Sequence, residues 1–274
     1  MKQIFKAGLT ALALGGMASG AWAADTCAAG KTLHDGVLTI ATGNPAYFPW
    51  VIDDDPASGQ GFEAAVALEI AKRMGFEGDA VQWVRTTFDQ AIQPGAKDFD
   101  FNLQQYSITP ERDEFIDFSL PYYTAAQSVI VLAPTKEAGA APTVDSLKGL
   151  KWGAVESTTA PGLIKELVSP DVSMLLYNDV ADSVEALKAG QVDAIMLDLP
   201  SALFTAAVLL YNGTVLGQFA TGGDSPDQLG LGFEEGNSLR DCANEAISAM
   251  VEDGTLAAIE AEWLQDATGV PVIK

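Results

Sequence analysis

The residues of this 274-residue chain that could do chemistry gather first around Arg112. Arg112 ends the run Ser107-Ile108-Thr109-Pro110-Glu111-Arg112. Thr109 suits an N-cap and Pro110 the first helical position, so the run predicts a turn into a helix. A guanidinium beside free helix N–H groups and the Ser107 hydroxyl can bind both oxygens of a carboxylate. Taken alone, however, the run fits a capped surface helix with a solvated arginine better.

The flanking sequence reverses that weighting. The pattern D-x(6)-S-I-T-P-E-R, followed by D-F-S-x-P-Y-Y at 117–123, resembles the signature of the periplasmic amino-acid-binding proteins of ABC importers, the family 3 solute receptors. The resemblance implies that Arg112 binds the α-carboxylate of an amino acid and that Ser107 assists. Gln104, Gln105 and Tyr106 replace the small or apolar residues that are usual there, which affects the ligand side chain recognised and not the carboxylate clamp.

The same resemblance assigns further ligand-binding residues. Tyr47 and Phe88 match two aromatic residues that pack on the ligand, and Asn44 stands where the family has an acid. Thr159 matches a ligand-binding threonine at a helix start, and Asp198 matches the aspartate that holds the α-amino group. The alternatives are core packing for Phe88, an N-cap for Thr159 and an ordinary helix cap for Asp198.

The polar residues near this expected site limit the ligand side chain. Asn44, Gln104, Gln105 and Glu156 supply amides and one acid, and no further arginine or lysine is evident near the motif. This favours a neutral polar or basic amino acid, or a related small amine acid, over glutamate or aspartate. The alternative for Glu156 is a position in bulk water.

An enzyme on the same scaffold, similar to the exported dehydratases that resemble these receptors, is the main functional alternative. It would need a positioned acid with a raised pKa in the cleft, and Glu156 is the only candidate. A membrane-tethered sensor would need an extension that this chain is expected to lack. The sequence has no C-x-x-C, no H-E-x-x-H and no third cysteine, so we expect no metal, cofactor or catalytic residue.

The elements that must position these residues are short β-rich runs followed by helix starts, as at 37–42 and 192–198. Ligands of open α/β sheets bind where such strands end. The resemblance implies an α/β, two-lobed periplasmic binding protein of type II, in which each lobe is a mixed, mostly parallel sheet flanked by helices and a two-strand hinge joins the lobes. The expected boundaries are a signal peptide at 1–23, lobe 1 at 24–124 and 229–274, and lobe 2 at 125–228.

The chain ends and the charge bear on location and partners. Lysines at 2 and 6, an apolar core at 9–17 and Ala21-Trp22-Ala23 predict a cleaved secretory signal peptide and a periplasmic protein. The net charge is −22, which makes nucleic acid and anionic membrane poor partners. We expect a monomer that carries its amino acid to a membrane permease.

The two cysteines, Cys27 and Cys242, lie near opposite ends of the mature chain. In an oxidising compartment they predict one disulfide that ties the N-terminal tail to a C-terminal helix. Two free thiols are the alternative.

Overall fold

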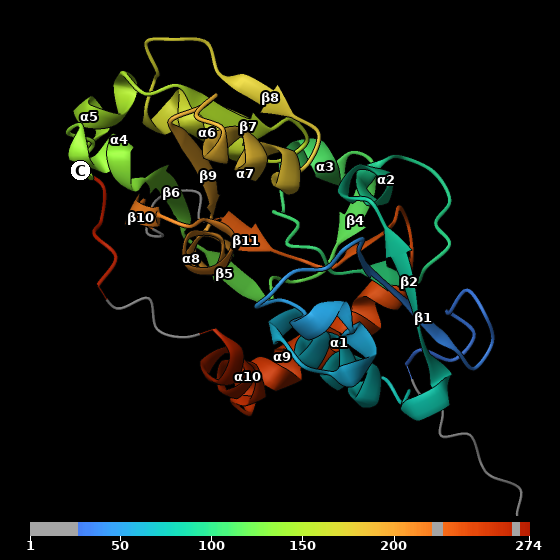
Figure 1. Ribbon diagram of the computed structural model, residues 1–274. Coiled ribbons are helices and arrows are strands. Elements are labelled where there is room, and N and C mark those ends of the chain that lie inside the picture. Colours follow the sequence, from blue (N-terminus) through green and yellow to red (C-terminus); the bar gives the residue numbers. More distant parts are fainter. Residues whose placement is uncertain (1–26, 221–226, 265–268) are drawn as a thin grey trace, which may run out of the picture.

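The computed structural model describes residues 27–220, 227–264 and 269–274, which form two lobes (Figure 1). The signal peptide expected at 1–23 lies outside the described residues. Each lobe contains one five-stranded sheet, with the order β2-β1-β3-β12-β4 in lobe 1 and β10-β6-β9-β7-β8 in lobe 2. The strands of lobe 1 are β1 (Leu38–Gly43), β2 (Val81–Thr86), β3 (Phe101–Asn102), β4 (Ile116–Phe118) and β12 (Gly232–Glu234). Those of lobe 2 are β6 (Gln127–Leu132), β7 (Trp152–Val155), β8 (Leu175–Tyr177), β9 (Ala194–Asp198) and β10 (Gly213–Gln218).

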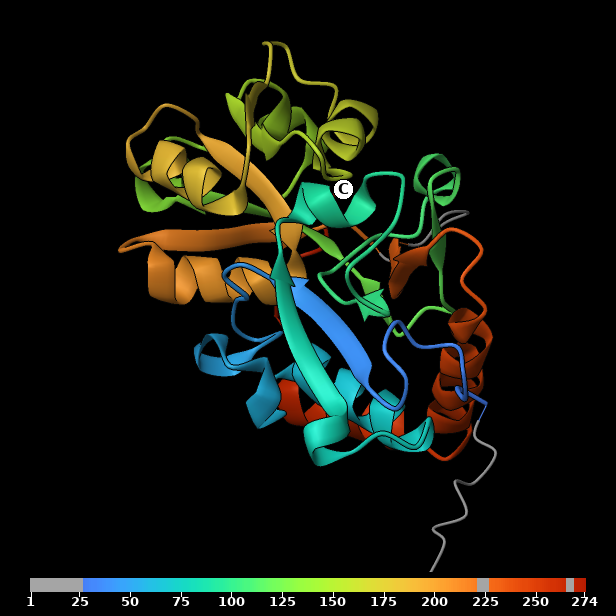
Figure 2. The same ribbon diagram turned by 90° about the vertical axis from the view of Figure 1, so that its right-hand side faces the viewer.

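In each sheet four strands run in one direction and one strand opposes them. The reversed strand is β12 in lobe 1 and β6 in lobe 2. Figure 2 shows the parallel pair of β1, in blue, and β2, in cyan. The prediction of an α/β protein with two mixed, mostly parallel sheets is therefore confirmed.

A two-stranded antiparallel ribbon joins the lobes. It pairs β5 (Tyr123–Ala125) with β11 (Asp227–Leu229), and each of these strands leads into the reversed strand of the next sheet. The ribbon is the predicted two-strand hinge. The expected boundaries after residues 124 and 228 fall inside its strands, and the division into domains that they mark stays a prediction.

Helices lie on both faces of each sheet. In lobe 1 they are α1 (Phe62–Arg73), α2 (Phe88–Ile92), α3 (Pro110–Asp113), α9 (Leu239–Glu252) and α10 (Thr255–Trp263), with short 3-10 turns at Ile52–Asp54, Pro56–Ser58 and Gly78–Ala80. In lobe 2 they are α4 (Ala133–Glu137), α5 (Val144–Lys148), α6 (Ala160–Leu167), α7 (Val180–Lys188) and α8 (Leu199–Phe204), which continues into the π-helical turn η4 (Thr205–Leu209).

The alternation of side chains along the strands divides each core between the two faces of the sheet. In β1, Ile40 packs into a cluster with residues of α1 and α9, whereas Ala41 packs into a second cluster with Tyr106. In β6, Val129 belongs to the cluster that includes Leu147 and Ile164 of α5 and α6, and Ile130 to the cluster beneath α7 and α8. The second of these lobe 2 clusters forms part of the site described below.

The start of α1 depends on a glycine. Gly61 has φ +104°, and a Cβ built on it would lie 2.6 Å from the carbonyl oxygen of Trp50. Any larger residue would therefore displace the preceding loop. Glu63 N–H donates to the same Trp50 oxygen at 3.0 Å, which ties the first helical turn to this loop.

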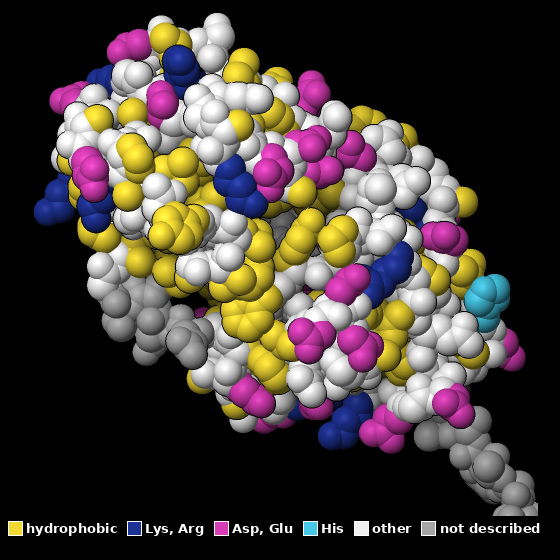
Figure 3. All heavy atoms as spheres, in the orientation of Figure 1, with side chains coloured by type: hydrophobic (Ala, Val, Ile, Leu, Met, Phe, Trp, Pro, Cys, Tyr) yellow, Lys and Arg dark blue, Asp and Glu magenta, His cyan; other side chains and the backbone are white. Residues whose placement is uncertain are grey.

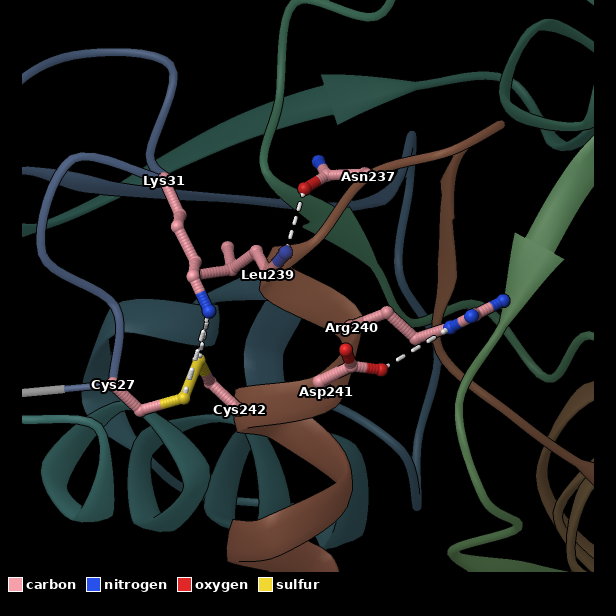
Figure 4. The surroundings of a disulfide bond; sticks show 7 residues. All are labelled: Cys27, Lys31, Asn237, Leu239, Arg240, Asp241 and Cys242. Atoms are coloured by element: carbon pink, nitrogen blue, oxygen red, sulfur yellow. Dashed lines mark hydrogen bonds and ion pairs between the residues drawn. A yellow bond between two sulfur atoms is a disulfide. The ribbon is translucent and has the colours of Figure 1, made fainter.

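The predicted disulfide joins Cys27 to Cys242, which confirms the pairing of the N-terminal tail with α9 (Figure 4). The two Cα atoms are 5.6 Å apart and the loop spans 215 residues. The Lys31 ammonium lies 3.5 Å from the sulfur of Cys242, and Asn237 Oδ1 accepts a hydrogen bond from Leu239 N–H at the start of α9. The N-terminal end of the described chain is thus fixed to lobe 1.

The last described segment differs from expectation. The sequence places all of 229–274 in lobe 1, but residues 269–274 lie on lobe 2, next to β10. Gln218 N–H donates to Pro271 O and Ile273 N–H donates to Gln218 O, each at 2.8 Å, while the Ile273 side chain is buried in the α5 and α6 core. The contacts lie 52 or more residues away in sequence, so no local pattern at the C-terminal end reveals them.

No helix in the parts of the chain described here is long and apolar enough to cross a membrane.

Candidate functional site

A cavity of ≈ 310 Å³ lies between the two lobes and is lined by both. In the space-filling view, hydrophobic side chains gather along the boundary between the lobes (Figure 3). Seven of the residues that the sequence singles out as ligand-binding line this cavity: Tyr47, Phe88, Gln105, Ser107, Arg112, Thr159 and Asp198. The other two, Asn44 and Glu156, are exposed and are not among its lining residues.

Arg112 reaches from lobe 1 to lobe 2. Its Nη1–H donates to Ser107 O at 2.9 Å, and its Nη2–H donates across the cleft to Ser157 O at 3.0 Å. The guanidinium carbon lies 5.4 Å from the centre of the Phe88 ring. Burial lowers the pKa of Arg112 from its usual value, because a charge is costly away from water. An anion in the cavity would compensate this charge.

The helix start that precedes Arg112 is smaller than the sequence suggests. Helix α3 has only four residues, and the N–H of Arg112 is engaged by the Oγ1 of Thr109 at 3.3 Å. The expected cradle of free N–H groups is therefore reduced, and the guanidinium is the main cationic group of the motif. Ser107 is buried and bridges to Leu229 of the hinge strand β11, which attaches the motif to the hinge.

Asp198 enters the cavity from the opposite lobe. It ends β9 and caps α8, where its Oδ1 accepts a hydrogen bond from Ser201 N–H at 2.9 Å. The helix cap and the cavity position hold together, so they are not alternatives. Burial raises the pKa of Asp198 to about 6, with a further contribution from the charge of Asp227. A cationic ligand group would favour its ionised form.

The hydroxyl of Thr159 makes no capping hydrogen bond. The cap at the start of α6 is provided by Thr158, whose Oγ1 accepts from Ala160 N–H at 3.3 Å and donates to Val155 O at 2.8 Å. Thr159 stands at the N-cap position without acting as the cap through its side chain. Its side chain lines the cavity.

The loop that carries Tyr47 is braced from outside the cavity. Asp54 Oδ1 accepts from Ala46 N–H at 2.8 Å and from Arg85 Nη1–H at 2.5 Å, and the same guanidinium nitrogen donates to Gly43 O at 2.7 Å. The acid that the family has at the Asn44 position is absent, and Asp54 instead holds this loop. This brace is a feature that the sequence reading did not identify.

A second feature missing from the sequence reading is the role of Glu63. This buried carboxylate accepts hydrogen bonds from the backbone and the side-chain amide of Gln105 and from the Tyr122 hydroxyl. Burial raises the pKa of Glu63 to about 7, and the charge of Asp198 raises it as well. Gln105 has φ +53°, so Glu63 holds a non-glycine residue in the left-handed region at the cavity wall. The available sequence signal is Gly61-Phe62-Glu63, a helix start that is also a common structural feature.

Of the polar groups that favoured a neutral polar or basic ligand, two do not line the cavity, and the other two line it with part of each amide in a hydrogen bond within the protein. Asn44 and Glu156 do not line it, the Gln105 amide is bonded to Glu63, and Gln104 Oε1 accepts from the Tyr106 hydroxyl. The dehydratase alternative also required Glu156 to line the cavity. That alternative loses the acid that the sequence offered for it, and the cavity acid with a raised pKa is instead Asp198.

Contacts between described residues hold the lobes against each other. Besides the bond from Arg112 to Ser157 O, Trp50 Nε1–H donates to the Ser201 hydroxyl at 2.8 Å, and the rings of Phe48 and Phe204 are 5.0 Å apart. In each pair the first residue belongs to lobe 1 and the second to lobe 2. No group of three or more His, Cys, Asp or Glu residues suited to a metal occurs within the described ranges.

Two lobes joined by an antiparallel ribbon, with a guanidinium from one and a carboxylate from the other at a shared cavity, define the class of two-lobed solute-binding proteins. The chain belongs to the bacterial extracellular solute-binding proteins, family 3, whose model matches residues 38–266. This confirms the family predicted from the Arg112 motif.

Curated relatives with similar sequences are binding proteins. The chain is 28% identical over 235 residues to the L-cystine-binding protein TcyJ of Escherichia coli (strain K12), covering 85% of this chain and 84% of the relative. It is 31% identical over 219 residues to the ABC transporter glutamine-binding protein GlnH of Bacillus subtilis (strain 168), covering 77% and 76%.

A solved structure supports the fold. An ancestral arginine-binding protein bound to glutamine superimposes with a TM-score of 0.68 at 26% identity, covering 85% of this chain and 100% of that chain. Since the curated relatives are binding proteins and not enzymes, the comparisons agree with the expectation of a non-enzymatic protein.

Proposed function

We propose that the cavity captures a zwitterionic amino acid by closure of the two lobes and that the protein delivers it to the membrane permease of an ABC importer. In this proposal the chain is exported to the periplasm by the signal peptide at 1–23. The names of the relatives support the ligand class and the transporter, because they include amino-acid-binding proteins and a component of an ABC transporter.

The observation that carries the proposal is the division of charge between the lobes. Arg112 of lobe 1 and Asp198 of lobe 2 line the same cavity, and an α-amino acid carries one anionic and one cationic group. We assign the carboxylate to Arg112, assisted by Ser107 and Thr159, and the ammonium to Asp198. The aromatic rings of Tyr47 and Phe88 and the amide of Gln105 complete the contacts. Asn44 and Glu156 have no part in it.

Closure then follows from the same division. A ligand shifts an open–closed equilibrium only by the difference in its affinity for the two forms. Neither charged residue alone satisfies both ends of a zwitterion, so the ligand gains its second charged contact only when the lobes meet. The closed form would present the surface that the permease recognises.

The test is the response of thermal stability to amino acids. A ligand at about a hundred times its dissociation constant stabilises the folded state by roughly 2.7 kcal/mol, so a melting-temperature screen of ligand-free protein detects binding. Each charge-assisted hydrogen bond contributes about 1.5–3 kcal/mol, so Arg112→Ala should weaken binding by at least a hundredfold and abolish the shifts.

The control is Lys165→Ala, which removes one positive charge from an exposed position outside the cavity. Circular dichroism of both variants checks that the fold is intact, and Arg112→Lys tests whether the planar fork matters beyond its charge. Unchanged amino-acid binding in a folded Arg112→Ala variant would remove this residue from the site.

A further inference from the structure

One wall of the cavity takes no part in the charged contacts proposed above. It is formed by Val180, Ala181 and Val184 from the first two turns of α7 and by Phe204 and Leu209 from α8 and η4. All five side chains are hydrocarbon. We call them the apolar wall.

The apolar wall is backed by core. Val184 is 3% exposed and belongs to the hydrophobic cluster that contains Ile130, while Val180 and Leu209 pack against that cluster. Ser201 and Thr205 of the same segment also line the cavity, but the cluster behind Val180, Val184 and Leu209 is hydrophobic. Close packing also makes its shape resistant to change.

The wall continues across the cleft into lobe 1. The Phe48 ring lies 5.0 Å from the Phe204 ring and also lines the cavity, yet it is 46% exposed. When a ligand covers apolar surface that was in contact with water, the bound state is stabilised. Both lobes therefore offer hydrocarbon to the same part of a bound molecule.

The charged residues that line the cavity beyond Arg112 and Asp198 already have partners. Lys188 Nζ lies 2.6 Å from Glu185 Oε1 at the C-terminal end of α7, and the two side chains are 40% and 69% exposed, so this pair is at the rim. Asp227 Oδ2 accepts from the Gln127 amide. Asp227 would repel an acidic ligand side chain, and a basic one would have to displace the Gln127 amide or separate the Lys188–Glu185 pair.

The size of the cavity fits a bulky ligand. An engineered cavity of about 150 Å³ holds a benzene molecule, and the volume here is ≈ 310 Å³. There is room for a ring-sized side chain together with the amino and carboxylate groups. Small amino acids would leave the apolar wall uncovered.

We infer that the side chain of the bound amino acid lies against the apolar wall, and that the protein selects amino acids with a large uncharged side chain, aromatic, branched aliphatic or thioether, over small, acidic and basic ones. This inference rests on the proposed function and narrows its ligand class.

A panel of amino acids tests it by thermal shift and then by isothermal titration calorimetry on ligand-free protein. The panel contains phenylalanine, leucine and methionine against alanine, serine, glutamine, glutamate, arginine and cystine. One methylene in an apolar pocket changes discrimination by about tenfold or more, so we expect the first three to bind at least tenfold more tightly than any of the others. If serine, glutamine, arginine, glutamate or cystine leads, the inference is wrong and the proposed function stands. If no amino acid binds, the proposed function fails.

Variants of the wall locate the effect. Phe204→Ala should weaken the binding of phenylalanine or leucine at least tenfold more than that of alanine, because loss of the Phe48 contact between the lobes affects every ligand alike. The matched control is Val208→Ala in the adjoining turn, whose side chain is 64% exposed and does not line the cavity.

A second variant guards against misfolding of the first. Val180→Thr nearly preserves volume and places a hydroxyl in the wall, so it should weaken the binding of the large apolar ligands several-fold and leave alanine binding unchanged. Equal losses for large and small ligands in both variants would contradict a contact with the ligand side chain.

Discussion

Arg112 spans the cleft with its own hydrogen bonds. One nitrogen of its guanidinium bonds to Ser107 O in its own lobe and another to Ser157 O in the opposite lobe. Five N–H donors are available in a guanidinium, so these two bonds leave donors for a carboxylate. The residue that would bind the ligand therefore also makes a hydrogen bond that requires the two lobes to be in contact.

Asp198 supplies a pH-dependent prediction at the same scale. Its pKa is raised to about 6 from the usual 3.8, so the folded protein favours the protonated carboxyl. The stability contributed by this group is complete below about pH 4 and is lost as the pH rises through about 6. Asp198→Asn keeps an acceptor for Ser201 N–H and cannot ionise. The melting temperature of the ligand-free variant, relative to the wild type, should therefore be higher at pH 8 than at pH 4.

Ligand binding should respond in the opposite direction. An ammonium group needs the ionised carboxylate, so wild-type affinity should fall as the pH drops below about 6. Asp198→Asn should bind roughly 10- to 100-fold more weakly at pH 8 and lose this pH dependence, because one charge-assisted hydrogen bond is worth about 1.5–3 kcal/mol. Calorimetric titrations at both pH values measure it. The control is Asp193→Asn. Asp193 precedes β9 and lies outside the cavity, so this variant should bind like the wild type. An equal loss of affinity in Asp193→Asn would refute the assignment of the ammonium to Asp198.

The sequence predicts the charged pair of the proposed site and misses much of its remaining wall. Arg112 and Asp198 belong to recognisable sequence motifs. The residues of the apolar wall have only the spacing of any helix that packs on a sheet, as Val180, Val184 and Phe204 show. A side chain that faces a cavity and one that faces a core are the same residue type at the same periodicity. Only the three-dimensional arrangement separates them.

Among the elements, the first turn of α1 and the loop after β3 act as a unit. Glu63 accepts from the backbone N–H and the amide of Gln105, 42 residues away, and from the Tyr122 hydroxyl, 59 residues away. A left-handed conformation at a residue other than glycine costs of order 1–3 kcal/mol, and these hydrogen bonds offset that cost. Such separations explain why the sequence around Glu63 does not indicate its partners.

Removing one donor from this unit gives a prediction at the scale of elements. The pKa of Glu63 is raised to about 7, and the Tyr122 hydroxyl lowers it from a still higher value. Tyr122→Phe should therefore raise the pKa of Glu63 further, so that stability falls more steeply as the pH rises through about 7. We expect a loss of about 1.5–3 kcal/mol at pH 9, where the acceptor is charged, and about 1 kcal/mol at pH 5.

Urea unfolding at the two pH values measures this difference. Tyr211→Phe serves as the control, since the Tyr211 side chain is fully exposed and the substitution should change neither value. A Tyr122→Phe loss that is equal at pH 5 and pH 9 would contradict the dependence on the charge of Glu63.

At the scale of the whole molecule, three described segments relate one lobe to the other. Two are the hinge strands β5 and β11, and the third is residues 269–274, which follow the lobe 1 helix α10 and dock on lobe 2. The two sheets and the ribbon between them could be predicted from the resemblance. The docked end could not, because it depends on a single isoleucine and on backbone bonds to β10 and to residues 142 and 144.

Ile273→Ala tests the contribution of this docked segment. The side chain is 7% exposed in the core of lobe 2, and truncation of a buried isoleucine costs about 2–5 kcal/mol. We expect a loss within that range in urea unfolding, with faster hydrogen exchange in β10 and β6. Val272→Ala, one residue earlier and 47% exposed, should cost less than about 0.5 kcal/mol. Faster exchange confined to lobe 1 would contradict the assignment.

The disulfide and the docked segment place the two ends of the described chain on different halves of the protein. Cys27 is bonded to α9 of lobe 1, whereas Lys274 N–H donates to Pro142 O of lobe 2. Fluorophores attached near these two positions would change their separation whenever the halves swing apart or together. Energy transfer between them would then follow uptake and release of the cargo in real time, with no label inside the chamber that holds it.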